Sequence, residues 1–401
     1  LTMLARDWVT GRGGTLTALT VDHGLRPEAA GEARIVAGWC AELGVPHAIL
    51  VWQGTKPEKG IQAAARDARY RLLTDWCHRH GCTELLVGHT ENDQAETFLL
   101  RMSRGSGIDG LAAMPLVSHR DGLRLIRPLL TVSRSRIAAT VTDRSLPTVT
   151  DPGNADRRYT RVRLRDTVAA LETQGISART IAGTARIFGT LRAARETAIG
   201  VLAAKIATVH GEGYAEIDRA ALVAADADIA RGLVSVLIGA VGGQDYPPRR
   251  ERLDRLMEYV LGDTVFRPRT LGNCVLGVRR QFLTIRREYR TIRHVEPVLP
   301  GKRLVWDGRF DVVFAQNFAT DDPMEKKTYT LRALGEAGWR NIVTTAQSPE
   351  IRRIPGPVRY ALPAIWENGD VVEVPHLNYR AKQIIDNIVE IAQFRSEPVL
   401  T

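Results

Sequence analysis

The first 150 residues alternate short runs of β-branched and aliphatic residues with longer helical patterns. Strands separated by helices in this way pair in parallel, with right-handed crossovers and helices on both faces of the sheet. The pattern predicts strands at 15–21, 47–52 and 84–87 and helices at 28–43, 61–80 and 91–104. The sequence therefore predicts an α/β domain built on a parallel sheet.

Ligands of such sheets bind beyond the carboxyl ends of the strands. Asp22 and His23 end the first predicted strand, and Gly88 and His89 follow the third. Polar atoms at the end of a buried strand are costly without a ligand or a partner, although a turn with satisfied hydrogen bonds gives the same pattern. We take this edge of the sheet as the candidate site.

Acidic residues open the helix that is expected after Gly88. Asp93, Glu96 and Thr97 are three and four residues apart, so they share one helix face. Two neighbouring carboxylates can hold a divalent cation or neutralise a bound amine. Acids in a first helical turn also complement the helix dipole, and the pattern alone leaves both interpretations open.

Two further segments place cationic or glycine residues near the predicted elements. The helix at 61–80 has Arg66 and Tyr70 on one side. The segment that contains Arg104, Gly105 and Gly107 would let backbone N–H groups approach a phosphate. Surface helix residues and an ordinary helix end are the alternatives for these two segments.

Charge points to a polyanionic partner. Lysine and arginine number 55 against 45 acidic residues, a net charge of +10, of which 121–170 carries +5 and 241–310 carries +7. Clustered positive charge binds phosphates through counterion release, although an arginine-rich solvated surface is the alternative. No apolar stretch approaches the ~20 residues that cross a bilayer, and the first residues do not resemble a secretory signal. We expect a cytoplasmic protein that does not act in the membrane.

The remaining chain divides by composition. Alanine- and arginine-rich helical patterns follow residue 164 and predict helices at about 177–210 and 219–241. The β-branched content rises after Leu271, and the stretch 381–394 favours a helix. We predict three domains, at 1–165, 166–295 and 296–401. The second is helical and the third is small and mixed α+β. The four cysteines are too few and too scattered for a disulfide framework.

Four motifs together resemble one enzyme family. They are VDHGLRPE, IQAAARDARYR, GHTENDQAETFLLR and RGSGIDGLAAM, and the resemblance to tRNA(Ile)-lysidine synthases covers about 165 residues strongly. It implies a domain of the N-type ATP pyrophosphatase superfamily, which is adenine-nucleotide-hydrolase-like. The family uses ATP and Mg²⁺ to adenylate the wobble cytidine of the isoleucine tRNA with a CAU anticodon. Free L-lysine then attacks C2 and AMP leaves, which changes decoding from AUG to AUA.

The resemblance also implies roles for residues at matching positions. Asp93 and Glu96 would bind the lysine amine or a metal ion, with Asp93 as the metal ligand, His89 beside them and Arg66 near the base or phosphates. The implied nucleotide-binding residues are Asp22, His23, Gly88, Arg104, Gly105 and Gly107. The implied tRNA-binding residues are Arg127, Arg134, Arg136, Arg161, Arg163 and Arg165. A homodimer is compatible with the resemblance.

The sequence departs from the family pattern in two places. The Ser-Gly-Gly-x-Asp-Ser loop that cradles pyrophosphate in the family is absent from these 401 residues, so we expect a sequence that starts downstream of its natural beginning and binds ATP poorly. Thr90 and Asn92 stand where the family often has His and Asp. Two alternatives remain, a non-catalytic tRNA-binding remnant and a tRNA-thiolating relative. Cys77 and Cys82 do not form a convincing thiolation pair.

Overall fold

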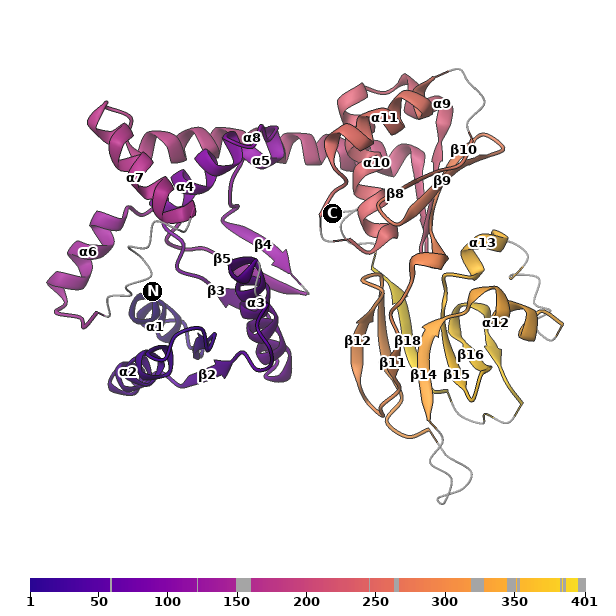
Figure 1. Ribbon diagram of the computed structural model, residues 1–401, viewed down its shortest axis with the longest axis horizontal. Coiled ribbons are helices and arrows are strands. Elements are labelled where there is room, and N and C mark those ends of the chain that lie inside the picture. The colour runs from indigo at the N-terminus through magenta and orange to yellow at the C-terminus, as the bar shows by residue number, and fades with distance from the viewer. Residues whose placement is uncertain are drawn as a thin grey trace. The chain divides into compact units, whose positions relative to one another are not determined.

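The computed structural model groups the chain into two compact units, Leu1–Ala193 and Ala194–Thr401, each described by itself below (Figure 1). The predicted domain boundaries at 165/166 and 295/296 remain predictions. The structure describes all residues except 58–59, 121, 149–159, 245, 263–266, 319–327, 345–350, 352–353, 383, 385–386 and 396–401.

The first unit alternates helices and short strands, and the predicted parallel-sheet domain is confirmed. Its strands are β1 (Ala18–Asp22), β2 (His47–Val51), β3 (Glu84–Leu86), β4 (Val117–Arg120) and β5 (Leu123–Ile126). Its helices are α1 (Thr2–Thr10), α2 (Ala29–Glu42), α3 (Ile61–Arg79), α4 (Glu91–Met102), α5 (Ile108–Leu111), α6 (Arg134–Asp143), α7 (Thr160–Thr173) and the first part of α8 (Ala178–Ile206).

Two parallel strand pairs build this unit. β1 pairs with β2, with Ala18 opposite His47, and β3 pairs with β5, with Glu84 opposite Arg124. The sequence predicted neither β5 nor β4, which pairs antiparallel with β5 and forms the edge of a three-stranded sheet. Since parallel strands end at the same edge, the residues after β3 and β5 lie close together.

The apolar face of α4 packs against α7 and α8. Ala95, Phe98 and Leu99 lie at most 8% exposed in a core shared with Val168 and Ile181. This packing fixes which side of α4 meets α7. It therefore determines where the polar residues of the two helices come together.

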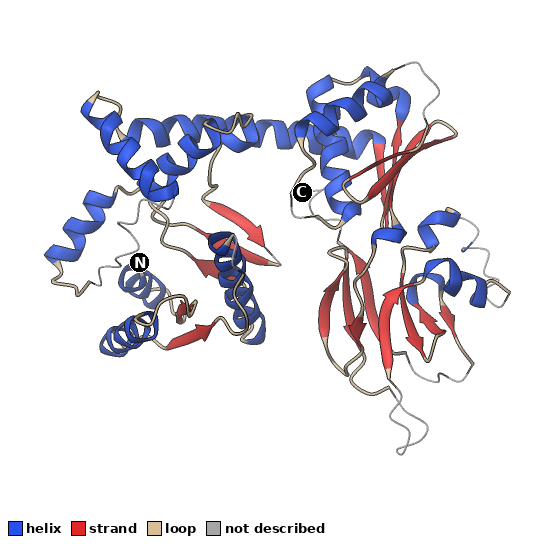
Figure 2. Cartoon of the chain, viewed as in Figure 1, coloured by secondary structure: helices blue, strands red, loops and turns tan. Residues whose placement is uncertain are grey.

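The second unit combines helices with antiparallel sheets (Figure 2). Its helices after α8 are α9 (Arg219–Ala224), α10 (Ala227–Gly242), α11 (Arg250–Leu261), α12 (Gly335–Ile342) and α13 (Gly356–Arg359), with short 3₁₀ turns at Tyr289–Thr291 and Pro375–Leu377. The first sheet has the order β6-β7-β10-β9-β8, from β6 (Ala207–His210), β7 (Tyr214–Asp218), β8 (Arg269–Leu271), β9 (Cys274–Arg279) and β10 (Phe282–Arg287).

Two further sheets complete the unit. One has the order β11-β14-β15-β16-β17 and the other the order β12-β13-β18. Their strands are β11 (Glu296–Pro297), β12 (Arg303–Trp306), β13 (Phe310–Phe314), β14 (Tyr329–Ala333), β15 (Pro363–Glu367), β16 (Asp370–Val374), β17 (Tyr379–Arg380) and β18 (Val389–Phe394).

Three secondary-structure predictions for this unit were wrong. The long helix predicted at 177–210 ends at Ile206 and continues as strand β6. The helix predicted at 219–241 is two helices, because Asp226 caps a new one by accepting hydrogen bonds from two backbone N–H groups. The helix favoured at 381–394 is wrong in its last part, where β18 pairs with β13.

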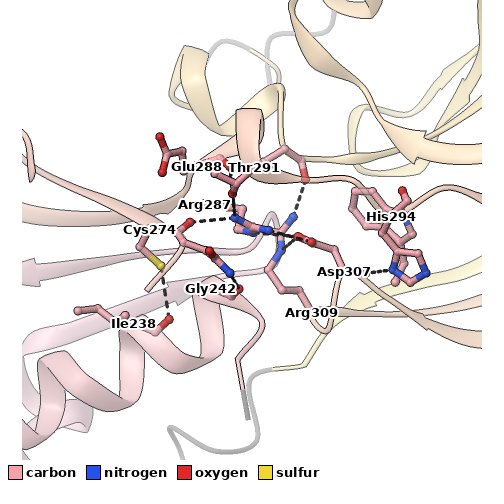
Figure 3. Close-up of polar contacts among 12 residues, drawn as sticks. Ile238, Gly242, Cys274, Arg287, Glu288, Thr291, His294, Asp307 and Arg309 are labelled. Carbon is pink, nitrogen blue, oxygen red and sulfur yellow. Dashed lines mark hydrogen bonds and ion pairs between the residues drawn. The ribbon is translucent and has the colours of Figure 1, made fainter. Parts of the chain in front are cut away.

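A buried ion cluster ties β10 to the turn between β12 and β13 (Figure 3). The Asp307 carboxylate accepts from Arg287 Nε and Nη2 at 2.9 and 3.0 Å, and from Arg309 Nε at 2.7 Å. The Arg287 and Arg309 side chains are 4% and 0% exposed. Burial lowers the pKa of Arg309 to about 10, and Asp307 opposes that shift. One carboxylate is thus the shared counterion of two buried guanidinium groups and offsets part of their charge.

Close backbone contact brings α10 to the same turn. Gly243 has φ +64°, and a Cβ there would lie 2.1 Å from the Asp307 carbonyl oxygen. Glycine is therefore required at this position by both conformation and space. Among the described residues, none of the helices combines the length and apolar character that a membrane span needs.

Candidate active site

The N-terminus of α4 is closed by a capping box. Thr90 Oγ1 accepts from the Asp93 backbone N–H at 3.3 Å, and Asp93 Oδ2 accepts from Thr90 N and Oγ1 at 2.8 and 2.7 Å. Asp93 therefore has the structural role that acids in a first helical turn often have. Its other carboxylate oxygen, Oδ1, lies 3.8 Å from Arg134 Nη2.

Glu96 lies one turn further along α4 and completes an acid pair with Asp93. Its side chain is 5% exposed, and its Oε1 accepts from Arg165 Nε at 3.2 Å and lies 3.7 Å from Arg134 Nη2. Burial raises the pKa of Glu96 and the neighbouring Asp93 raises it further, whereas Arg165 and Arg134 lower it. The structure thus brings together the two predicted carboxylates and two of the arginines predicted to bind tRNA.

His89 lies close to the acid pair, after β3. Burial lowers the pKa of His89 to about 4, and the guanidinium of Arg127 lowers it further, while Asp93 opposes the shift. Its buried Nδ1 has no hydrogen-bond partner in the described part of the chain. His89 is therefore neutral at physiological pH, and its buried Nδ1 is unsatisfied within the described residues.

Arg127 follows β5 at the same edge and is 6% exposed. It donates to the Pro115 carbonyl and to Ser118 Oγ at 2.8 and 3.1 Å, while its buried Nε has no partner among the described residues. Burial lowers the pKa of Arg127, and the nearby Tyr70 opposes the shift. The prediction grouped Arg127 with the tRNA-binding arginines, but the structure places it inside the site, beside His89.

Three arginines surround Tyr70 of α3, which is 1% exposed. The guanidinium carbons of Arg66, Arg69 and Arg120 lie 5.1, 5.1 and 4.7 Å from the centre of its ring. Arg66 and Arg69 both lower the pKa of His89. This edge of the sheet therefore combines the acid pair with several arginine side chains. Such an arrangement suits a cationic and an anionic substrate held side by side.

The end of β1 contributes Asp22 and His23. Asp22 Oδ1 accepts from the Gly24 backbone N–H at 2.8 Å. Burial and the positive charge of Arg69 lower the pKa of His23, whose buried Nδ1 has no partner among the described residues. The positive charge of Arg69 lowers the pKa of both His23 and His89. Gly88 is exposed just before His89.

Arg104, Gly105 and Gly107 lie at the other end of α4. Arg104 follows Glu96 by eight residues, about 12 Å along the helix axis, which separates this segment from the acid pair. Arg101 donates to the Gly110 and Ala113 carbonyls at 2.9 and 3.2 Å and so holds this turn. The structure does not bring the glycine segment to the acid pair.

The remaining arginines that were predicted to bind tRNA lie on α6 and α7. Arg136, Arg161 and Arg163 are exposed, and Arg163 donates to Thr160 Oγ1 at 3.1 Å. A pocket of about 440 Å³ beside Arg136 is lined by residues of α4, α6, α7 and α8. The five arginines predicted on these two helices thus divide into two that reach the acid pair and three that face solvent.

The described side chains do not fit a magnesium ion held by protein alone. Mg²⁺ in nucleotide sites takes one or two carboxylates and completes its octahedron with phosphate and water oxygens. In the described ranges, no group of three or more His, Cys, Asp and Glu side chains is placed to hold a metal ion. Asp93 Oδ2 is occupied by Thr90, and arginines neutralise the acid pair. Asp93 as a metal ligand stays a prediction.

Two structural residues of the motif were missed in the sequence. Asn92 Oδ1 accepts from the Arg134 backbone N–H at 2.9 Å, so Asn92 positions the start of α6. Gln94 is buried and exchanges two hydrogen bonds with the Met114 backbone, at 2.9 and 3.0 Å. The only sequence signal for the role of Gln94 is that a polar residue stands on the apolar face of the predicted helix.

We expect Gln94→Ala to destabilise the first unit by about 2–3 kcal/mol, because the Met114 N–H and carbonyl would remain buried without partners. Urea unfolding followed by circular dichroism measures the change. Gln62→Ala is the matched control, since Gln62 is exposed on α3. Equal unfolding midpoints for the two variants would contradict the assignment.

Comparisons with known proteins identify the family of this chain. Residues 1–172 match the family model described as a PP-loop domain. The tRNA(Ile)-lysidine synthase of Ruegeria pomeroyi is 34% identical over 360 residues, which are 90% of this chain and 81% of that protein. The enzyme of the same name from Wolbachia pipientis is 32% identical over 93% of this chain and 84% of its own length.

Other matches are shorter. The tRNA(Ile)-lysidine synthase of Rhodopseudomonas palustris is 51% identical over 183 residues, 45% of this chain and 53% of that protein. Among solved structures, a U34-tRNA thiolase from Methanococcus maripaludis matches with a TM-score of 0.40 and 18% identity, over 47% of this chain and 68% of that chain. From the long matches to its relatives, we conclude that this chain belongs to the tRNA(Ile)-lysidine synthase family.

Proposed function

We propose that the acid pair binds the amine of free L-lysine and that the chain joins this lysine to C2 of the wobble cytidine of the CAU-anticodon isoleucine tRNA. Family membership makes the chain an ATP-using ligase of tRNA modification. The observation that carries the finer proposal is the acid pair itself. Asp93 and buried Glu96 lie beside a neutral His89. The arginines Arg66, Arg69 and Arg127 lie at the same edge of the sheet.

The proposed reaction has two steps. The cytidine O2 attacks the α-phosphate of ATP and pyrophosphate leaves. The lysine amine then attacks C2, and the C2–O2 bond breaks as AMP leaves with that oxygen. Adenylation is needed because an unactivated oxygen is a poor leaving group. Magnesium would enter with ATP as part of that substrate, with phosphate oxygens as its main ligands.

The described side chains suit both steps. The guanidinium groups of Arg66 and Arg127 favour a phosphate that gains negative charge in the first step. The lysine ammonium must lose a proton before the second step. Burial raises the pKa of Glu96, which makes its carboxylate a stronger base and a suitable acceptor for that proton.

The exposed arginines of α6 and α7 would contact tRNA phosphates. Phosphate contacts position a tRNA but carry no sequence information. Recognition of the anticodon would require unstacked bases to be read by other side chains.

Incorporation of radiolabelled lysine tests the proposed function. A chain extended upstream to include a Ser-Gly-Gly-x-Asp-Ser loop should give acid-precipitable label with ATP and the isoleucine tRNA, and the same tRNA with G34 should give none. Label that fails to appear although the tRNA binds would favour the tRNA-binding remnant instead. Radiolabelled sulfur donors distinguish the thiolating alternative.

We expect Arg163→Ala to weaken tRNA binding and to reduce its salt dependence, because one phosphate contact is lost. The slope of log K against log salt should fall by about one. Binding titrations at four or more salt concentrations measure it. Arg34→Ala on α2, which donates to the Ala30 carbonyl at 3.2 Å, is the control. An unchanged slope would remove Arg163 from the contact surface.

A further inference from the structure

The proposed lysine site is already filled by two cations of the chain itself. Arg165 Nε lies 3.2 Å from Glu96 Oε1, and Arg134 Nη2 lies 3.7 Å from the same atom and 3.8 Å from Asp93 Oδ1. Two positive side chains thus neutralise two carboxylates. A lysine ammonium would need the same oxygens, so it competes with both arginines.

The two carboxylates cannot simply lose their partners. The Glu96 side chain is 5% exposed, and a buried carboxylate without a partner is strongly unfavourable. The two arginines are more accessible than Glu96, since the Arg134 and Arg165 side chains are 47% and 30% exposed. They can therefore reach a ligand in solution while the carboxylates stay buried. One cation must replace another at the acid pair.

Arg134 and Arg165 lie on the two helices that carry the exposed arginines. Arg136 is two residues from Arg134 on α6, and Arg163 is two residues from Arg165 on α7. Residues two apart on a helix do not share a face, so different phosphates of a tRNA that approaches these helices would reach the two members of each pair. Guanidinium groups bind phosphates with two parallel hydrogen bonds, which makes phosphate an effective competitor for the acid pair.

We propose that Arg134 and Arg165 are exchangeable counterions which couple lysine binding to tRNA binding. Without tRNA, the two arginines neutralise Asp93 and Glu96. Phosphates of the bound tRNA attract the arginines, and the lysine ammonium takes their place. The inference rests on the proposed function, because it takes the acid pair as the lysine site. Its consequence is that the free protein binds lysine weakly and the tRNA complex binds it tightly.

Calorimetric titration of lysine, without ATP, tests the coupling. Wild-type protein with saturating tRNA should bind lysine at least fivefold more tightly than the free protein, the lower end of typical coupling between sites. Because coupling is reciprocal, saturating lysine should tighten tRNA binding by the same factor. This second measurement needs no variant. Equal lysine affinity with and without tRNA would overturn the proposal.

Arginine substitutions test which groups carry the coupling. In Arg165→Gln, and more so in the double variant Arg134→Gln/Arg165→Gln, the free protein should bind lysine more tightly and tRNA should add little. Arg34→Gln should leave the lysine affinity and the coupling unchanged. Coupling of wild-type size in the double variant would assign it to other residues and overturn the proposal.

The outcome separates this inference from the proposed function. Wild-type protein that incorporates lysine into tRNA but shows no coupling keeps the function and rejects the exchange of counterions. Protein that binds no lysine, with or without tRNA, and incorporates none rejects both.

Discussion

Asp307→Ala is expected to destabilise the second unit by about 3–5 kcal/mol, the cost of leaving a buried charge without its partner. The Asp307 carboxylate contacts both Arg287 and Arg309, whose side chains are nearly inaccessible. Natural domains are stable by only about 5–15 kcal/mol, so the loss removes a large share of the total. Urea unfolding of the full chain, followed by circular dichroism, measures the change.

Hydrogen exchange locates the effect. Amides of β10 and β13 should lose protection in Asp307→Ala, since the cluster joins β10 to the turn before β13 (Figure 3). The matched control is Asp311→Ala on β13, whose carboxylate is 32% exposed and lies 3.9 Å from Arg395 Nε. A surface pair of this kind contributes about 0–1 kcal/mol. Equal midpoints for the two variants would show that the cluster adds no stability.

The fold of the first unit was largely predictable, because its helices and strands have distinct periods. The helices predicted at 28–43 and 61–80 match α2 and α3 to within a residue or two. β4 and β5 were missed because each has only four residues, and β4 pairs antiparallel at an edge, where no crossover helix precedes it. Strand order follows from long-range pairing and is not visible in local periodicity.

The second unit was less predictable, because short strands there adjoin helical patterns. The end of the 177–210 stretch carries on the spacing of α8, but Ala207–His210 pairs with Tyr214–Ile217 across a tight turn. Similarly, Ile384 and Ile388 have helical spacing, yet Val389–Phe394 pairs with β13. In both places pairing with a distant or returning strand overrides the local preference.

The candidate site was predictable where it depends on one helix. The spacing of Asp93 and Glu96 predicts a shared face, and the structure places them together against Arg134. The arginine partners could not be predicted, since α6 and α7 come from separate parts of the chain. Their approach depends on the packing of Phe98 and Leu99 against α7 and α8.

Asp93→Asn and Glu96→Gln are each expected to reduce lysine incorporation roughly 30- to 1,000-fold, which corresponds to about 2–4 kcal/mol for one partner of a desolvated charge pair. Both changes keep the shape of the side chain and remove its charge. The affinity for tRNA should not fall and should rise, because Arg134 and Arg165 lose a carboxylate that competes with the tRNA phosphates. Incorporation kinetics at several lysine concentrations measure the loss, with Asp75→Asn on the exposed side of α3 as the control.

Comparison with alanine separates the two roles of Asp93. The asparagine oxygen can still accept from Thr90, so Asp93→Asn keeps the capping box, whereas Asp93→Ala removes the charge and the two hydrogen bonds that the Asp93 side chain accepts. The hydrogen bond from the residue 93 backbone N–H to Thr90 Oγ1 remains in both variants. Loss of the two side-chain bonds costs roughly 1 kcal/mol of stability. Asp93→Ala should therefore unfold at a lower urea concentration than Asp93→Asn, while both lose incorporation to a similar degree. Wild-type incorporation in Asp93→Asn with a loss in Asp93→Ala would mean that the residue acts through the helix end alone. The lysine ammonium would then have Glu96 as its only carboxylate partner in this pair.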